Sequence, residues 1–271
     1  MQSLERGLAV LRAFSAEEPE LSLSDVARRT GLTRAAARRF LLTLVDLGYV
    51  AADGRSFSLR PRVLELGYAY LSGISLSEVA VPHLERLSEQ VHESSSVAVL
   101  DGDDVVYVAR VATKRIMTVA ISVGTRFPAY ATSLGQVLLA DLPPHELEEY
   151  LDGVDLRRLT SRTVATATAL RTKLGAVREQ GWCLVDQELE EGLTSVAAPL
   201  REPGGLVVAA VNVSTHASRR PPASLETDLV GPLLRTAEAI EAELRVTGTR
   251  WHSAAGRAGL PASGSGGPPG A

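Results

Sequence analysis

Residues 22–48 read SLSDVARRTGLTRAAARRFLLTLVDLG and have the layout of a helix-turn-helix. Ser24 and Asp25 can begin a first short helix. Gly31 permits the left-handed backbone of a turn, and Thr33 can then cap a second helix. The sequence therefore predicts two helices separated by a tight turn.

The predicted second helix has two faces of different chemistry. At 100° per residue, one face is apolar and consists of Ala36, Ala37, Phe40, Leu41, Leu44 and Leu47. The opposite face consists of Arg34, Ala35, Arg38 and Arg39. A helix that enters the major groove of DNA needs small side chains near its axis and guanidinium groups that reach guanine edges or phosphates. Thr33 and this arginine face are therefore the candidate DNA contacts; the alternative is a surface helix whose arginines are only solvated.

A hairpin follows the second helix. Residues 47–50 begin an extended segment, residues 52–55 (ADGR) form a turn, and residues 56–59 (SFSL) alternate as a returning strand. Helix, turn, helix and hairpin together predict a winged helix-turn-helix. Arg55, at the tip of the wing, joins the candidate DNA contacts.

The charge of the chain is divided unevenly. Its total is −4, but residues 24–62 hold eight arginines against three aspartates, a net charge of +5 that leaves −9 for the rest. A basic module beside an acidic body is expected when one domain meets phosphate and the other does not. The length of 271 residues also exceeds a single winged helix and fits two domains.

Cysteine usage and hydropathy indicate the compartment. The single cysteine, Cys183, cannot form an internal disulfide and cannot by itself build a cysteine-based metal site. No basic-apolar leader opens the chain, and no apolar run approaches the ~18 residues of a membrane span. We expect a reducing, cytoplasmic location and no contact with a membrane.

Motifs of catalysis are missing from the sequence. It contains no G-x-S-x-G elbow, no Gly-rich phosphate loop and no H-E-x-x-H, and its five histidines lack metal-binding spacing. Cys183 is expected in the core rather than as a nucleophile. Residues 188–191, an acidic run, are expected as a solvated loop rather than as a carboxylate pair. We therefore expect no catalytic residue, no metal and no cofactor.

The hydrophobic period predicts the remaining elements. One helix is expected over residues 3–14, and a connecting helix is expected from Pro61 to Gly73. Further helices are expected over residues 76–90, 133–140, 146–151, 168–180 and 225–245. Strands are expected over residues 96–100, 105–109, 116–123, 182–187, 194–200 and 206–214. This order indicates an α+β domain with an antiparallel sheet.

Residues 4–73 resemble the N-terminal domain of IclR-type transcriptional regulators. The resemblance rests on LERGLAVLRAF, LSLSDVARRTGLTRAAARRFLLTLVDLGYV, DGRSFSL and PRVLELGYAYL, and it continues to about residue 245. Within the family, the chain resembles most closely the branch that controls aromatic catabolism and responds to protocatechuate, 4-hydroxybenzoate or β-ketoadipate. The segments that carry this narrower likeness are TRAAARRFLLTLVDLGYV, TKRIMTVAISVGTRFPAYATSLGQVLLA and GWCLVDQELEEGLTSVAAPL.

The resemblance implies a domain organisation and a set of partners. A winged helix-turn-helix over residues 1–60 is joined by a connecting helix, residues 61–74, to a GAF-like domain over residues 75–247 that binds the effector and forms oligomers. Residues 248–271, rich in Gly, Ala, Ser and Pro, are expected to be disordered. The implied partners are a double-stranded DNA operator, a small organic acid and further copies in a homodimer or tetramer, with RNA polymerase as an additional candidate.

The resemblance also implies where the effector binds. The backbone at Ser133 and Leu134 holds the effector's carboxylate, at a predicted helix start where unpaired N–H groups and the helix dipole favour an anion. The alternative is that Thr132 or Ser133 merely caps this helix. The family's polar pocket residues map onto Val185, Ser195, Asn212 and Ser214.

Two of these positions depart from the family pattern. Val185 stands where many members have an acidic residue, and Ser195 stands where cysteine is frequent. Asp186 cannot replace the missing carboxylate, because neighbouring strand residues point to opposite faces. A pocket without that carboxylate repels a second anionic or aromatic group less, which favours an acid larger than glyoxylate or pyruvate.

Three further side chains are candidates for the effector site. Arg115 and Arg126 lie beside strand edges, and a guanidinium can hold a carboxylate with two parallel hydrogen bonds. Either arginine can instead be an exposed loop residue. Tyr130, near the helix start, is one of few rings available to stack on an aromatic effector.

Three functions follow from these observations. The first is a ligand-gated transcriptional regulator. The second is an enzyme of small-acid metabolism with a helical appendage, and the third is a GAF-like signalling module whose helix-turn-helix contacts protein. Salt separates the first from the third, because arginine–phosphate binding weakens steeply as salt rises whereas a protein interface changes little.

Overall fold

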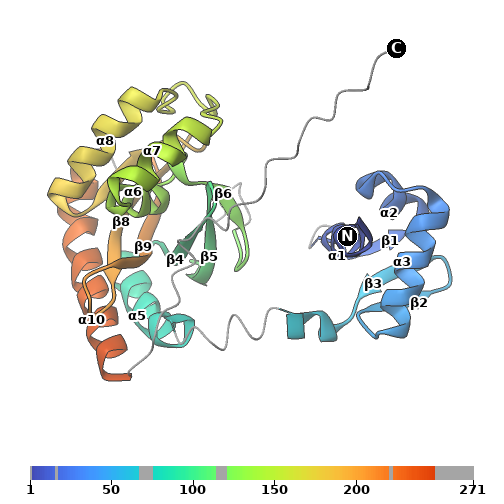
Figure 1. Ribbon diagram of the computed structural model, residues 1–271. Helices are drawn as coiled ribbons and strands as arrows, with labels where there is room; N and C mark the ends of the chain where they lie inside the picture. Colours follow the sequence, from blue (N-terminus) through green and yellow to red (C-terminus); the bar gives the residue numbers. More distant parts are fainter. Residues whose placement is uncertain (1, 16–17, 67–75, 114–120, 220–221, 248–271) are drawn as a thin grey trace, which may run out of the picture. The chain divides into compact units, whose positions relative to one another are not determined.

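The computed structural model describes residues 2–15, 18–66, 76–113, 121–219 and 222–247. It divides the chain into two compact units, Met1–Gly73 and Ile74–Ala271 (Figure 1). Part of the expected connecting helix falls on described residues: Pro61–Leu64 form a 3-10 turn, η1, and residues 65–66 are helical. The remainder of that helix and the tail from residue 248 lie outside the described residues.

The first unit is a winged helix-turn-helix, as the sequence predicts. Its helices are α1 (Gln2–Arg12), α2 (Leu23–Thr30) and α3 (Arg34–Asp46), and its strands are β1 (Glu20–Ser22), β2 (Val50–Asp53) and β3 (Ser56–Leu59). The strands form an antiparallel sheet in the order β1-β3-β2. Its buried core consists of Val10, Phe14, Leu21, Val26, Ala27, Ala37, Leu41, Leu44 and Val50.

The turn between α2 and α3 follows from its sequence. Gly31 is left-handed with φ 66°, and Thr33 caps α3 by accepting the Ala36 N–H at 3.2 Å, both as expected. The expected start of α2 at Ser24 is wrong. The cap is Ser22, whose Oγ accepts the Asp25 N–H at 3.3 Å while the Asp25 carboxylate accepts the Ser22 N–H at 3.2 Å.

The apolar face of α3 differs from the prediction at its last residue. Ala37, Leu41 and Leu44 are buried, but Leu47 is 51% exposed. The helix ends at Asp46, and the chain turns at Gly48 with φ 80°. Leu47 therefore lies past the part of the helix that packs on the core.

The second unit is built on a six-stranded antiparallel sheet in the order β6-β5-β4-β9-β8-β7. Its strands are β4 (Ser94–Asp101), β5 (Asp104–Val111), β6 (Arg126–Pro128), β7 (Cys183–Asp186), β8 (Leu193–Arg201) and β9 (Val207–His216). Its helices are α5 (Leu76–Val91), α6 (Ser133–Asp141), α7 (Pro144–Gly153), α8 (Ala167–Gln180), α9 (Pro222–Leu225) and α10 (Gly231–Thr247), with a 3-10 turn, η2 (Ala129–Ala131), before α6. The α+β class expected from the sequence is confirmed.

Helices cover both faces of this sheet (Figure 1). On one face, α5 and α10 enclose a core of aliphatic side chains with the inward residues of β4, β8 and β9. On the other face, α6, α7 and α8 cover a second core. The second layer is the one that holds the candidate effector residues.

Two elements differ from the sequence expectations. The strand expected over residues 116–123 falls largely on residues 114–120, outside the described residues, and residues 121–123 form no strand; the strand at this edge is β6. The final helix is also not continuous from Leu225, because a π-helical turn over Glu226–Val230 precedes α10. Pro232 lacks the N–H that would continue an α-helical hydrogen-bond ladder across this point.

Within the described residues, no helix combines the length and hydropathy that crossing a membrane requires.

Candidate functional site

The arginines of the first unit fall into two groups. Arg28, Arg29 and Arg62 have protein partners: Arg28 donates to Asp25 at 2.9 Å, Arg29 pairs with Glu18, and Arg62 pairs with Glu65 at 3.3 Å. The guanidinium groups of a second set make no hydrogen bond or ion pair to the described residues. This set consists of Arg34, Arg38, Arg39, Arg55 and Arg60 on α3 and the wing, together with Arg12 at the end of α1.

The unpartnered set includes every arginine predicted to contact DNA. Arg34, Arg38 and Arg39 are exposed on α3 beside the exposed Ala35, and Arg55 is exposed at the turn between β2 and β3. Thr33 is exposed at the start of the same helix. Buried Ala37 and Leu41 hold the opposite face of α3 against the core, so the arginine face is free to meet a partner.

Arg60 is a further unpartnered arginine that sequence reasoning did not select. It follows β3 directly, on the hairpin that carries Arg55. From the sequence alone, Arg60 would be selected as a DNA contact only if the wing were taken to extend one residue past its alternating strand.

A narrow pocket of about 10 Å³, the space of a single water molecule, lies between the start of α6 and one face of the large sheet. Five of the eight predicted effector residues line it: Ser133, Val185, Ser195, Asn212 and Ser214. The other lining residues are Tyr107, Ile121, Ala131, Thr132, Leu189 and Leu193. No charged side chain is among these described lining residues, which are partly polar and partly apolar.

Strand register explains why these residues meet. Val185 pairs with Ser195, and Ser195 pairs with Ser214, so one row crosses β7, β8 and β9 on a single face. Asn212 lies two residues before Ser214 on β9 and therefore faces the same side. Asp186 faces away from this row and pairs with Arg162, as expected from strand alternation.

The start of α6 supplies the donors of the cavity. Thr132 is the cap, and its Oγ1 accepts the Gly135 N–H at 2.9 Å. The N–H groups of Ser133 and Leu134 make no hydrogen bond within the described residues. The cap and the candidate carboxylate site are thus compatible, because capping leaves the first two N–H groups of the helix unpaired.

Ser133 also binds the sheet through its side chain. Its Oγ lies 2.8 Å from the Ser195 Oγ, and both residues are buried. This hydrogen bond fixes the first turn of α6 against β8. The helix start is therefore held at a defined position above the polar row.

The remaining predicted effector residues do not line the cavity. The Tyr130 hydroxyl donates to the Arg157 carbonyl at 2.9 Å, and the ring is buried in the core under α6. The Leu134 side chain is also in that core, so only its backbone can serve a ligand. Arg115 lies outside the described residues.

Arg126 joins the strands of a hairpin instead of facing the cavity. Its Nη1 donates to Asp101 at 2.5 Å, and its Nε donates to Asp104 at 3.1 Å. Both carboxylates lie at the turn between β4 and β5. These two ion pairs satisfy the guanidinium, which removes Arg126 from the candidate effector residues.

Tyr107 is the aromatic side chain of the cavity that sequence reasoning missed. It lies on β5, pairs with Ala98 across the sheet, and meets Phe127 edge to face with ring centroids 5.8 Å apart. Burial raises the pKa of the Tyr107 phenol to about 12, so the hydroxyl stays protonated. The alternating pattern of β5 indicates that Tyr107 faces one side of the sheet, but it does not tell which side holds the cavity.

A buried polar network supports the back of α6, and it corrects one expectation. Glu188 was expected in a solvated loop, but it is only 5% exposed. Its carboxylate accepts from Gln136 at 3.1 Å and pairs with Lys173. Cys183 donates to Gln136 at 3.1 Å, and burial raises the pKa of its thiol to about 12, which confirms a core position.

We expect Lys173→Met to lower the free energy of unfolding by about 3–5 kcal/mol, because the substitution leaves the Glu188 carboxylate buried without its cation. Urea denaturation of the full chain measures this loss. The matched control is Arg171→Met, which removes an exposed pair with Glu148 and should cost about 0–1 kcal/mol. Equal small losses in both variants would show that Glu188 is solvated.

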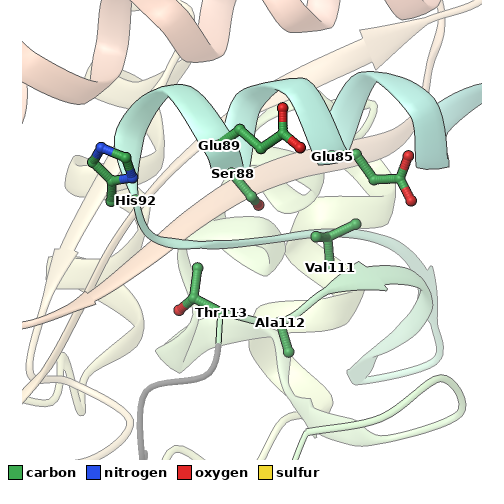
Figure 2. A pocket seen from close by; sticks show the side chains of 7 residues that line it. All are labelled: Glu85, Ser88, Glu89, His92, Val111, Ala112 and Thr113. Atoms are coloured by element: carbon green, nitrogen blue, oxygen red, sulfur yellow. The ribbon is translucent and has the colours of Figure 1, made fainter.

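A second hollow lies between α5 and the end of β5 (Figure 2). Two carboxylates, Glu85 and Glu89, stand one helical turn apart on α5, and an acid would meet like charge there. The cavity at α6 is therefore the better site for an anion. The second hollow is lined by Glu85, Ser88, Glu89, His92, Val111, Ala112 and Thr113.

A winged helix-turn-helix with an unpartnered arginine face, joined to a second unit that has an uncharged pocket at a helix start, is typical of a ligand-responsive regulator of transcription. Family models agree: that of the IclR helix-turn-helix domain matches residues 3–54, and that of the bacterial transcriptional regulator IclR C-terminal region matches residues 68–242. The chain belongs to the IclR family of DNA-binding transcriptional regulators, whose C-terminal domain binds an effector. The family and the aromatic-catabolism branch predicted from the sequence are confirmed.

Three similar proteins illustrate the likeness. The Pca regulon regulatory protein of Pseudomonas putida is 48% identical over 235 residues, 86% of this chain and 81% of that protein. The crystal structure of a protein from Rhodococcus sp. RHA1, described as a transcriptional regulator, is 60% identical with a TM-score of 0.81 and covers 91% of this chain and 99% of its own. An IclR homologue of Microbacterium hydrocarbonoxydans, solved with 4-hydroxybenzoate, is 28% identical with a TM-score of 0.80 and covers 90% of this chain and 99% of its own.

Proposed function

We propose that this regulator responds to a small organic acid, an aromatic acid or a metabolite of the β-ketoadipate pathway, that binds in the cavity at the start of α6. One observation carries the proposal: the N–H groups of Ser133 and Leu134 are unpaired at the start of α6, and Ser133 lines a pocket without charged side chains among its described residues. A carboxylate at this point gains two charge-assisted hydrogen bonds and the favourable end of the helix dipole. No carboxylate of the described lining opposes it.

The lining of the pocket supports an aromatic acid. Tyr107, Ile121 and Leu193 add apolar surface to the polar side chains of β8 and β9. A lining that is partly apolar and partly polar suits a ring that carries a carboxylate. The Microbacterium homologue holds 4-hydroxybenzoate, a ligand of this shape.

The DNA side of the proposal rests on α3 and the wing. Thr33, Arg34, Ala35, Arg38, Arg39 and Arg55 contact an operator in the cytoplasm. Two copies of the chain in a dimer, or four in a tetramer, bind a palindromic site, because two-fold symmetry in the protein demands the same symmetry in the DNA. RNA polymerase is a further partner if the bound regulator activates transcription.

A thermal-shift screen of the full chain tests the proposal. Protocatechuate, 4-hydroxybenzoate, β-ketoadipate and pyruvate are compared at equal concentration. A ligand at 100 times its Kd stabilises the folded state by about 2.7 kcal/mol, and the Tm should rise by about 5–10 °C for at least one of the first three acids. A flat response to all of them would overturn the proposed ligand class.

We expect Ser133→Pro to weaken binding of the acid about 10- to 100-fold, measured by isothermal titration calorimetry. Proline removes one hydrogen bond to a charged group, worth about 1.5–3 kcal/mol. The fold should tolerate it, because Ser133 is the first residue of α6, a position that accepts proline, and Thr132 has the extended backbone that proline requires before it.

Ser133→Ala is the matched control for this substitution. It removes the hydroxyl that binds Ser195 but keeps the backbone N–H, so the affinity for the acid should change only a few-fold. If Ser133→Pro folds and binds the acid as the unaltered chain does, the carboxylate sits elsewhere.

A further inference from the structure

Two buried polar atoms on the cavity side of the sheet lack partners among the described residues. They are the Nε of Arg110, on β5, and the Oδ1 of Asn212, on β9. Buried donors and acceptors are almost always satisfied in native proteins, and an orphaned one costs about 1–3 kcal/mol. An unpaired donor and an unpaired acceptor together therefore indicate a missing third group.

Strand register places both residues in one row. Ser96, on β4, pairs with Arg110 on one side and with Asn212 on the other, so the three side chains share a face of the sheet. The Arg110 Nη1 donates to the Ser96 Oγ at 3.1 Å. Neighbouring strands lie about 4.8 Å apart, so this hydrogen bond draws the guanidinium over β4 toward Asn212.

This row adjoins the cavity. Asn212 lines the cavity directly, and so does Tyr107, which lies three residues before Arg110 on β5. Arg110 thus stands at the edge of the same space as the proposed ligand.

The chemistry of the two orphaned atoms selects the missing group. The Arg110 Nε can only donate, whereas the Asn212 Oδ1 can only accept, since the Asn212 Nδ2 already donates to the Ser214 Oγ at 3.1 Å. A hydroxyl satisfies both atoms, because it accepts from the first and donates to the second. A carboxylate satisfies only Arg110 and brings its negative oxygens against the Asn212 carbonyl.

The position of the row also fits the other end of the ligand. Ser133 binds Ser195, which pairs with Ser214, while Asn212 lies two residues before Ser214 on β9, about 6.6 Å away along the strand. This offset matches the span between the two substituents of a para-substituted benzene ring. A carboxylate at the start of α6 therefore leaves a para substituent near Asn212.

We propose that Arg110 and Asn212 form a specificity-determining subsite for a hydroxyl group at the far end of the effector. The effector class is then a hydroxy-substituted aromatic acid, rather than an unsubstituted aromatic acid or a dicarboxylate. This inference rests on the proposed function, since it assigns the second end of a ligand whose carboxylate occupies the start of α6. Ser96 is a positioning residue that holds the guanidinium over β4.

Calorimetric titration of the full chain with four acids tests the proposal. All four acids carry a ring carboxylate. The para substituent is hydrogen in benzoate, a hydroxyl in 4-hydroxybenzoate and in protocatechuate, which has a further meta hydroxyl, and a second carboxylate in terephthalate. We expect 4-hydroxybenzoate or protocatechuate to bind about 10- to 100-fold more tightly than benzoate, since hydrogen bonds to charged groups contribute more than neutral ones. Terephthalate, with a carboxylate at the para position, should bind no better than benzoate.

Arg110→Met should remove this preference and leave the affinity for benzoate within about threefold. Arg126→Met is the matched control, because it removes an arginine of the same sheet that is bonded to Asp101 and Asp104 and does not line the cavity. That variant should keep the full preference for the hydroxylated acid. If Arg110→Met fails to fold, the relative affinities of the four acids for the unaltered chain still test the proposal.

The outcomes separate this inference from the proposed function. Equal affinity for benzoate and the hydroxylated acids, tighter binding of terephthalate, or a preference that survives in Arg110→Met would each overturn the hydroxyl subsite while leaving an acid-binding cavity. Absence of binding by all aromatic acids would overturn the proposed function as well.

Discussion

Arg38→Ala is expected to weaken binding of the operator duplex by about 30-fold to 20,000-fold. Arg38 lies in the middle of the exposed face of α3, one helical turn after Arg34, and no described residue binds its guanidinium. A good arginine contact to a base contributes about 1–3 kcal/mol of discrimination, and the proposed dimer would lose two such contacts at once. Fluorescence anisotropy with an operator selected from genomic DNA measures the change.

Two controls make the Arg38 result specific. Arg158→Ala removes an exposed arginine from the second unit and should leave operator binding unchanged. Arg38→Ala itself should keep the thermal shift produced by the acid, because the two sites belong to separate compact units. Operator affinity that survives Arg38→Ala would show that another face of the domain reads the DNA.

Salt dependence distinguishes the role of each arginine. Replacement of an arginine that contacts phosphate reduces the slope of log K against log salt by about one per contact and weakens binding to all sequences alike. Replacement of one that contacts a base relaxes sequence preference instead. Weak salt dependence of the unaltered protein would favour a helix-turn-helix that contacts protein.

Gly135→Ala is expected to destabilise the chain by about 3 kcal/mol or more and to abolish acid binding. A Cβ at Gly135 would overlap the backbone of Ala129 in η2, which no side-chain movement can relieve. The first turn of α6 must then move away from η2, and the N–H groups of Ser133 and Leu134 move with it. We expect the Tm to fall by about 6–12 °C.

Gly175→Ala is the matched control within the same layer. Gly175 lies inside α8, is exposed, and has open space where a Cβ would be placed. Alanine in a helix interior should stabilise the chain by about 0.5–1 kcal/mol relative to glycine. A Tm of Gly135→Ala equal to that of Gly175→Ala would contradict the close packing of α6 on η2.

Much of the fold follows from local sequence patterns. Gly31 ends the first helix of the helix-turn-helix and Thr33 begins the second. Both effects can be predicted because left-handed backbone and helix capping depend on only a few neighbouring residues. Ser22 and Ser24 are both suitable residues to cap α2. The capping box with Asp25 selects Ser22, which the prediction from the sequence did not take into account. The break before α10 depends on Pro232. The spacing of hydrophobic residues, from which the helix was predicted, does not reveal such a break.

The candidate site was predictable where it depends on strand alternation and on family resemblance. Ser195, Asn212 and Ser214 line the cavity together because their strands pair in the register that places them on one face. Burial of Glu188 and the orphaned atoms of Arg110 and Asn212 could not be predicted, because they depend on contacts between distant segments. Nothing in the structure explains Leu42, which is 40% exposed on the arginine face of α3.

Transcription from a bound promoter, measured against the concentration of the acid identified by thermal shift, tests the coupling of the two units most directly. With the unaltered chain, the acid should change transcription about 5- to 150-fold, the range of a coupling free energy of 1–3 kcal/mol. Ser133→Pro should shift the half-maximal response to about 10- to 100-fold higher acid concentration, and Arg38→Ala should remove regulation at every concentration. A folded Ser133→Pro variant that responds at the same acid concentration as the unaltered chain would contradict control through the cavity at α6.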